Sequence, residues 1–275
     1  MSTPTPQPQV LAFFGATGGV CATTLALALH AGHTCTALAR TPQKLTDLLR
    51  TAHAVPAAAL ESLLTIHAGD VKDPAACAAA LVSPLNPAAL VDTIVFGVGA
   101  APVLSWIPPF IGMTDATVCE TGTAAIFSAL DDLAARGIAT APAGSKPLFI
   151  SISTTGLSTK TRDVPLLLYP LYKLALHTPH LDKSRAETLL TRDAGVHIRD
   201  CVVVRPTLLT DAPRKGIQGV RAGWEWTGPE RERGGVREAG PQLGWSIGRK
   251  DVGGWVFERV VQEGGWEGRC VSLTY

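Results

Sequence analysis

The sequence predicts an α/β fold: a doubly wound, Rossmann-type parallel sheet with a small C-terminal region that covers the substrate. Short apolar runs of strand length alternate with longer segments of helical pattern from Val10 to Val204. A glycine-rich turn, Gly15 to Gly19, directly follows the first run. Strands that are each separated by a helix pair in parallel through right-handed crossovers, so the alternation indicates a sheet with helices on both faces.

The ends of the expected elements carry recognisable signals. Thr41 and Asp73 are N-cap residues, each followed by a proline at the first helical position, and Gly137 and Gly195 end two later helices. The predicted strands are Val10–Phe14, Thr34–Ala39, Leu63–Ala68, Thr93–Phe96, Leu148–Ser153 and His197–Val204. The predicted helices are Gly18–Ala31, Pro42–His53, Pro74–Leu81, Asp115–Arg136 and Leu181–Ala194.

Composition and charge exclude several classes of protein. Hydrophobic residues make up 46% and charged residues 17% of the chain, which is typical of a globular α/β protein and not of a disordered one. The net charge of +1 gives no electrostatic reason to expect nucleic acid or an anionic membrane as a partner. The longest apolar stretch, Val91 to Met113, is interrupted by an aspartate, glycines and prolines, so we expect no membrane span.

Cysteine usage and the N-terminus indicate a cytoplasmic protein. The six cysteines include no CxxC pair, so we expect reduced thiols and no metal site. The first nine residues lack the basic and apolar segments of a signal peptide. We expect residues 1–8 to form a short disordered tail.

The composition changes after Pro206. We expect residues 9–206 to form the Rossmann domain and residues 207–275 to form a C-terminal region packed on it. Residues 214–244 are rich in glycine, arginine and glutamate, and five of the six tryptophans lie at or after Trp224. In such a fold, the segment after the sixth strand lies near the carboxyl ends of the strands, where ligands bind. We therefore expect this region to cover the substrate.

The glycine-rich turn has the chemistry of a dinucleotide site. Gly15 allows a tight turn, and Gly18 and Gly19 let the backbone approach a diphosphate, with Thr17 and Val20 in the same loop. The N-terminus of the helix that follows points its partial positive charge at this anion. The position of the turn between a predicted strand and a predicted helix supports this interpretation.

The segment Phe14 to Cys21 resembles the atypical and extended short-chain dehydrogenase/reductase superfamily, particularly its NAD(P)H-binding, NmrA-like and flavin-reductase-like branch. That family usually has a third glycine where this chain has Cys21, a residue small enough to keep helix and strand close. The resemblance extends from about Val10 to Phe257 and implies a nicotinamide dinucleotide as cofactor.

The end of the second predicted strand favours NADP(H). NAD-binding proteins place a carboxylate there, whereas NADP-binding proteins place a cation for the 2′-phosphate. This chain has Arg40 at that point, with Lys44 one turn into the next helix and no carboxylate.

Further segments match the family in order. Gly69-Asp70-Val71 resembles the acidic segment that contacts adenine, and Gly97-Val98-Gly99 resembles the loop beside the adenine ribose. Arg205-Pro206 resembles the Arg-Pro turn near the nicotinamide. Ile247 to Val252 resembles a basic-Asp-Val element that is usually structural.

Reductases of this superfamily use a serine, a tyrosine and a lysine to protonate and polarise a carbonyl. Ser153, at the end of the fifth strand, matches the serine. For the other two, Tyr169 and Lys173 form one YxxxK pattern. In a second register Lys183 matches the lysine, and Pro179 stands where the tyrosine would be.

We favour the second register for the fold and expect Tyr169 to reach the pocket from the preceding loop. The candidate catalytic residues are therefore Ser153, Tyr169 and Lys183. His180 is an alternative proton donor.

The sequence thus predicts an NADPH-dependent oxidoreductase that reduces a small apolar carbonyl, enone or quinone-like substrate. The apolar segments Trp106–Phe110 and Leu166–Leu171 indicate the substrate class. Two alternatives stay open: a catalytically silent, NADP(H)-sensing NmrA-like regulator, favoured by Pro179, and a fold reused for isomerase or cyclase chemistry, favoured by Cys21. We expect a monomer or a homodimer.

Overall fold

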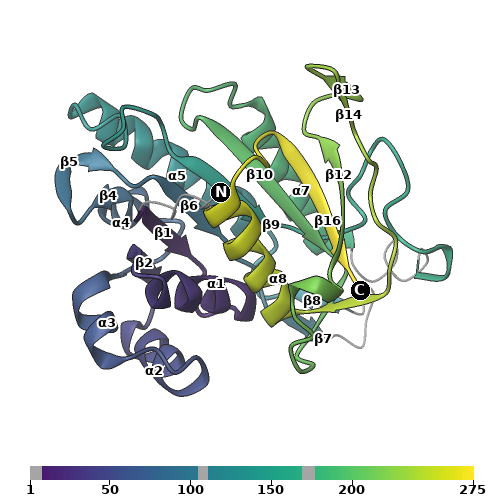
Figure 1. Cartoon of the computed structure of the whole chain (residues 1–275). Coiled ribbons are helices and arrows are strands. Elements are labelled where there is room, and N and C mark those ends of the chain that lie inside the picture. The colour runs from purple at the N-terminus through teal and green to yellow at the C-terminus, as the bar shows by residue number, and fades with distance from the viewer. Residues whose placement is uncertain (1–7, 105–110, 169–176) are drawn as a thin grey trace, which may run out of the picture.

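A mostly parallel sheet of eight strands runs through the molecule (Figure 1). In this computed structural model, residues 8–104, 111–168 and 177–275 are described. The order across the sheet is β12 (Arg221–Trp226), β16 (Arg269–Thr274), β10 (Asp200–Pro206), β9 (Leu148–Ile152), β6 (Thr93–Phe96), β1 (Val10–Phe14), β2 (Thr34–Ala39) and β3 (Leu64–Ala68).

The sheet confirms the doubly wound fold but is larger than predicted. All six expected strands are present and parallel, with small shifts at their ends. Two further strands come from the C-terminal region: β16 continues the parallel sheet beside β10, and β12 pairs antiparallel with β16 at the edge. The sheet therefore has two strands more than the six predicted: β12 lies within the glycine- and arginine-rich stretch 214–244, and β16 lies after it.

Alternation along the strands separates two apolar layers. In β1, Leu11 and Phe13 belong to one core cluster, whereas Ala12 and Phe14 belong to the other. The first layer is covered by α1 (Gly19–His30), α2 (Pro42–Ala52), α8 (Arg249–Trp255) and the π-helical segment Val256–Glu263. The second layer is covered by α4 (Pro74–Leu81), α5 (Val118–Ala135) and α7 (His177–Arg192).

Two predicted helices start at other residues in the structure, and for α5 a tertiary contact explains the difference. The carboxylate of Asp182, on α7, accepts hydrogen bonds from the backbone N–H groups of Cys119 and Glu120 at 2.9 and 2.8 Å. This carboxylate caps α5, which begins at Val118 and not at Asp115 as predicted. Among the described residues, helix α7 extends back to His177, four residues before the predicted start at Leu181.

Shorter elements connect the layers. They are α3 (Ala57–Leu63), the hairpin of β4 (Val82–Ser83) and β5 (Asn86–Leu90), β7 (Pro102–Leu104) with β8 (Ile111–Met113), β11 (Leu208–Thr210) with β15 (Ser246–Gly248), β13 (Glu232–Arg233) with β14 (Val236–Arg237), and 3₁₀ turns at Leu166–Leu168 and Ile217–Gly219. The predicted tail lies outside the described residues except for residue 8. Among the described helices, none has the length and apolar character needed to cross a membrane.

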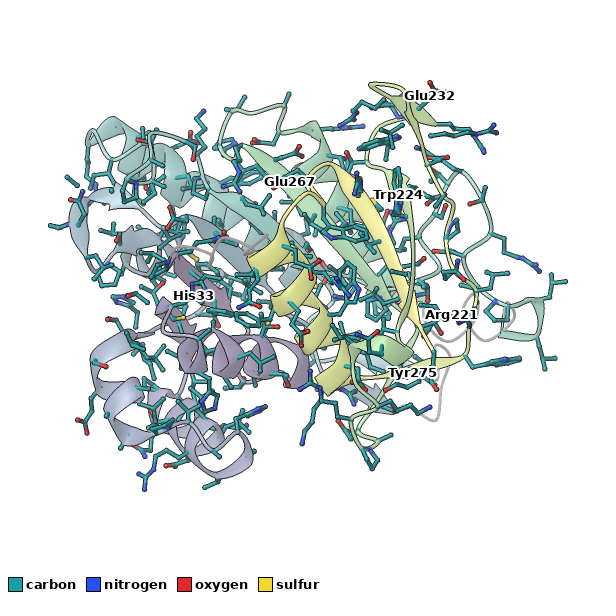
Figure 2. All side chains as sticks on the ribbon, in the orientation of Figure 1. His33, Arg221, Trp224, Glu232, Glu267 and Tyr275 are labelled. Atoms are coloured by element: carbon teal, nitrogen blue, oxygen red, sulfur yellow. The ribbon has the colours of Figure 1, made fainter. Side chains whose placement is uncertain are left out.

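The C-terminal tryptophans pack against the sheet edge. The guanidinium of Arg269 lies 4.5 Å from the ring centroid of Trp224 and within 5.4 Å of the centroids of Trp226 and Trp266. Figure 2 shows Trp224 on β12, beside the last strand. Cation–π contacts of this kind hold an edge strand in place, so these tryptophans have a structural role.

Candidate functional site

A cavity of about 530 Å³ lies at the carboxyl ends of β1, β2, β3 and β6. This is the edge at which doubly wound folds bind ligands. The predicted cofactor residues that line it are Gly15, Thr17, Gly18, Arg40, Asp70, Val71, Gly97, Val98 and Gly99. The predicted residues outside its lining are Gly19, Val20, Lys44, Arg205 and Pro206.

The glycines at this cavity allow two backbone segments to touch. Gly15 has φ of +81°, and a Cβ added there would lie 2.8 Å from the backbone of Gly97 and Val98. The N–H of Gly18 donates to the carbonyl oxygen of Gly15 at 2.9 Å and closes the turn. The first amides of α1, which have no partners within the helix, follow directly, so this cradle fits a dinucleotide diphosphate.

Cys21 replaces the third glycine without opening the packing. A Cβ at Gly97 would overlap the Cys21 sulfur, so α1 and the end of β6 meet through this thiol. Burial raises the pKa of Cys21 to about 12, and the positive charge of Lys183 opposes this shift. Cys21 is therefore a protonated packing residue.

The rim of the cavity carries cations at the end of β2. Arg40 lines the cavity and is exposed. Lys44, also exposed, lies in the first turn of α2, where its N–H donates to the carbonyl oxygen of Thr41 at 3.1 Å. These two side chains could hold a 2′-phosphate.

An ion pair at this cavity was missed in the sequence analysis. The ammonium of Lys72 lies 2.8 Å from Oδ2 of Asp115, and both residues line the cavity. The hydrogen bond from Lys72 lowers the pKa of Asp115. Asp115 was expected to begin a helix, and only the tertiary structure brings it to Lys72, 43 residues earlier in the chain.

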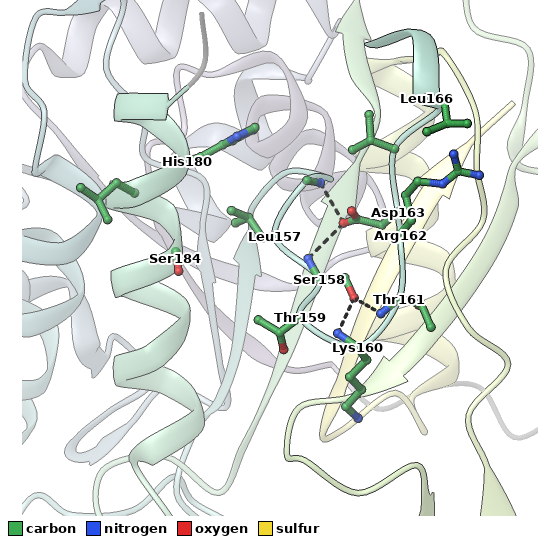
Figure 3. A pocket seen from close by; sticks show the side chains of 13 residues that line it. Leu157, Ser158, Thr159, Lys160, Thr161, Arg162, Asp163, Leu166, His180 and Ser184 are labelled. Carbon is green, nitrogen blue, oxygen red and sulfur yellow. Dashed lines mark hydrogen bonds between the residues drawn. The ribbon is translucent and has the colours of Figure 1, made fainter. Parts of the chain in front are cut away.

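A second cavity, of about 880 Å³, lies between α7 and the loop that follows β9 (Figure 3). His180, Leu181 and Ser184 line it from α7, and the loop from 156 to 164 lines the opposite wall. The buried carboxylate of Asp163 shapes this loop by accepting hydrogen bonds from the N–H groups of Gly156 and Ser158 at 2.8 and 3.3 Å.

Lys183 lies close to residues of both cavities, although it is in the lining of neither. Its ammonium donates a hydrogen bond to the carbonyl oxygen of Ile152, the last residue of β9, at 2.9 Å. Its positive charge acts to lower the pKa values of the Cys21 and Cys119 thiols, which contact Gly97 and Val98 in the lining of the first cavity. In α7, Lys183 lies one turn after His180 and directly before Ser184, and both of these neighbours line the second cavity.

Only the second of the two registers for the tyrosine and lysine lies within the described residues. Pro179 lies inside α7, four residues before Lys183, so the second register has proline at the tyrosine position. Tyr169 and Lys173, the other register, lie outside the described residues.

Ser153 belongs to a buried polar network. Its hydroxyl donates to Oε1 of Glu187 at 2.5 Å, and the guanidinium of Arg205 pairs with Oε2 of the same carboxylate at 2.6 Å. Burial acts to lower the pKa of Arg205, but the charge and hydrogen bond of Glu187, together with other nearby acidic groups, raise it. The Ser153 proton is thus directed to Glu187, and it could polarise a substrate carbonyl only after exchanging this bond.

The network extends to the second cavity through Glu225 on β12. One carboxylate oxygen of Glu225 lies 3.5 Å from Nη1 of Arg205. The other accepts hydrogen bonds from the hydroxyls of Ser158 and Thr161, both at 2.9 Å. Arg205, predicted to bind the cofactor, thus lies in a network that fixes the loop of the second cavity to the sheet.

The described part of the chain contains no group of three histidine, cysteine or acidic side chains that could hold a metal ion. All six cysteines are buried and unpaired.

Comparison with known proteins gives consistent findings. A family described as NAD(P)H-binding matches residues 15–260. The chain is 36% identical to "Reductase pytE" of Aspergillus terreus over 96% of its length and 97% of that protein. It is 38% identical to "Oxidase pynE" of Aspergillus niger, covering 100% of this chain and 99% of that protein.

Solved structures share the fold at low sequence identity. The oxidoreductase ylbE of Lactococcus lactis superposes with a TM-score of 0.60 at 16% identity, covering 96% of this chain and 90% of the other. ChuY, an anaerobilin reductase of Escherichia coli O157:H7, gives a TM-score of 0.55 at 17% identity, covering 96% of each chain.

Proposed function

Because the chain belongs to this NAD(P)H-binding family, we propose that it is an NADPH-dependent oxidoreductase that reduces a small apolar carbonyl, enone or quinone-like substrate. One observation carries the proposal: Lys183, held by the Ile152 carbonyl, lies close to residues of a cavity with dinucleotide-binding geometry and of a second cavity large enough for a substrate. The names of the two fungal relatives, a reductase and an oxidase, support redox chemistry.

The cofactor is NADP(H) in this proposal. Arg40 stands at the end of β2, where a carboxylate would bind the ribose hydroxyls of NAD. Arg40 and Lys44 are both exposed and would pair with the 2′-phosphate, while Asp70 and Val71 line the part of the cavity that suits adenine.

The reacting groups would meet beside Lys183. The bound nicotinamide supplies or accepts a hydride. The Lys183 ammonium, fixed by the Ile152 carbonyl, would hold the nicotinamide ribose and stabilise negative charge on the substrate oxygen. Tyr169 is our proposed proton donor, with His180 on the cavity wall as the alternative, and Ser153 completes the polar set.

The second cavity supports an apolar substrate. Leu157, Val164, Leu166 and Leu181 contribute to its walls. The lining also contains hydroxyl side chains and the cations Arg162 and Lys160, of which Lys160 is paired with Glu238. Its carboxylate, Asp163, is occupied by backbone N–H groups. A substrate with a neutral hydrocarbon body and one reducible oxygen fits this lining.

Pro179 favours one alternative function. A chain without a tyrosine at that position could bind NADP(H) and act as a sensor without turnover. We further propose a cytoplasmic location, supported by the six unpaired cysteines, and a monomeric or homodimeric state.

The test is a titration of the purified protein with NADPH and NADH, followed by NADPH oxidation against a panel of quinones, enones and aldehydes. We expect tighter binding of NADPH and turnover with at least one member of the panel. Binding without turnover on any substrate would favour the sensor. Absence of nucleotide binding would overturn both functions.

A further inference from the structure

Lys72 and Asp115 come from two different walls of the nucleotide cavity. Lys72 follows β3 and Asp115 precedes α5, and their side chains are 47% and 28% exposed. An exposed ion pair of this kind contributes little to stability, because water solvates both charges well. The position of the pair on the cavity lining is therefore its informative property.

Lys72 lies on the same rim as Arg40. Strands β2 and β3 are parallel neighbours, and Ala39 is opposite Ala68. The segments that follow the two strands therefore start side by side at the same edge of the sheet. The N–H of Lys72 donates to Oδ1 of Asp70 at 2.9 Å, which fixes the turn that carries it. Asp115 raises the pKa of Lys72, and the positive charge of Arg40 opposes that shift, as expected for two cations close together.

We propose that Lys72 is a second cationic ligand of the cofactor 2′-phosphate, and that Asp115 holds it as a counter-ion which the phosphate displaces. This inference rests on the proposed preference for NADP(H). A phosphate offers up to two negative charges and three acceptor oxygens, so it competes well against one carboxylate. An ammonium on a flexible chain can exchange partners without a fixed geometry, whereas the guanidinium of Arg40 binds as a planar fork.

The exchange predicts opposite effects for the two members of one ion pair. If Lys72 only stabilised the cavity wall through Asp115, loss of either partner would change ligand binding in the same direction. If Asp115 competes with the phosphate, its removal frees Lys72 and improves binding, while removal of Lys72 weakens it.

The experiment measures binding of 2′,5′-ADP and 5′-AMP by calorimetry, because these probes differ only in the 2′-phosphate and need no turnover. The quantity compared is the affinity for 2′,5′-ADP divided by the affinity for 5′-AMP. It is measured in the wild type, Lys72→Met and Asp115→Asn. We expect Lys72→Met to lower the ratio about tenfold, as for loss of one charge-assisted hydrogen bond. We expect Asp115→Asn to raise it about twofold to threefold, as a screened exposed charge is removed.

Lys250→Met is the matched control, since Lys250 is an exposed cation outside the cavity lining. An equal fall of the ratio in this control would show an effect of net charge alone and overturn the inference. So would an unchanged ratio in Lys72→Met, or a fall in both Lys72→Met and Asp115→Asn. If the wild type itself does not prefer 2′,5′-ADP, the NADP(H) assignment fails, and the inference fails with it.

Discussion

The sulfur of Cys21 lies where a side chain at Gly97 would project, so the first helix and the turn after β6 touch through one thiol. This contact keeps the start of α1 and the turn after β6, which both border the proposed nucleotide cavity, as close together as a residue without a side chain allows. It explains how a chain without the third glycine retains the cradle.

Gly97→Ala tests this contact. The new methyl group would overlap the sulfur, and overpacking a buried site costs about 1–3 kcal/mol of unfolding free energy. The Cβ of Cys21 is 3.5 Å from that methyl position, an ordinary contact, so adding Cys21→Ala should recover at least half of the loss. Urea denaturation of the double-mutant cycle measures this coupling. Gly99→Ala, which meets no atom within 4 Å, is the control, and additive effects at residues 21 and 97 would refute the contact.

Arg40→Asp tests the proposed 2′-phosphate site. The substitution replaces a cation on the cavity rim with an anion, so we expect the Kd for NADPH to rise at least about a hundredfold. The Kd for NADH should change by less than about threefold, because a carboxylate can accept from ribose hydroxyls. Fluorescence titration with both nucleotides measures the change. Equal losses for the two would contradict the assignment.

Lys183→Met tests the proposed role of Lys183 in the reaction. The variant keeps a side chain of similar length but loses the bond to the Ile152 carbonyl and the positive charge. We expect kcat to fall about a hundredfold or more, while the Kd for NADPH rises less than about tenfold. Steady-state kinetics on the best panel substrate and nucleotide titration separate the two effects. An unchanged kcat would exclude Lys183 from the reaction.

Glu187→Gln tests the buried network. The change leaves the Arg205 guanidinium without its main counter-charge, and breaking a buried pair in this way costs about 3–5 kcal/mol. Urea denaturation measures the loss. Glu263→Gln removes the partner of the more exposed Arg259 and should cost less than about 1 kcal/mol. Similar costs for the two variants would show that the network does not stabilise the fold.

His33 should make stability depend on pH. Burial lowers the pKa of His33, and its Nδ1 accepts a hydrogen bond from the N–H of Gln9 at 3.0 Å. Since the unfolded chain then binds more protons below about pH 6.5, the free energy of unfolding should fall as the pH drops through that value. His33→Gln should show a shallower fall between pH 7.5 and 5.5 in urea denaturation. Identical slopes would contradict this role.

The sequence alone determined the doubly wound fold and nine residues in the lining of the cavity proposed for the nucleotide. The six predicted strands are short apolar runs, and the N-cap and proline signals before α2 and α4 are local. Gly15, Gly18 and Arg40 could be assigned because the turn, the helix start and the end of β2 are adjacent in the chain. Backbone geometry of this kind depends on residues within one βαβ unit.

Only the tertiary structure decided the contacts between distant segments. It placed β12 and β16 in the sheet, brought Lys72 to Asp115, and directed Ser153 toward Glu187. It also showed that Cys21 takes the place of a glycine by filling the space beside Gly97. Such pairings depend on which segments meet after folding, and neither hydrophobic period nor local propensity carries that information.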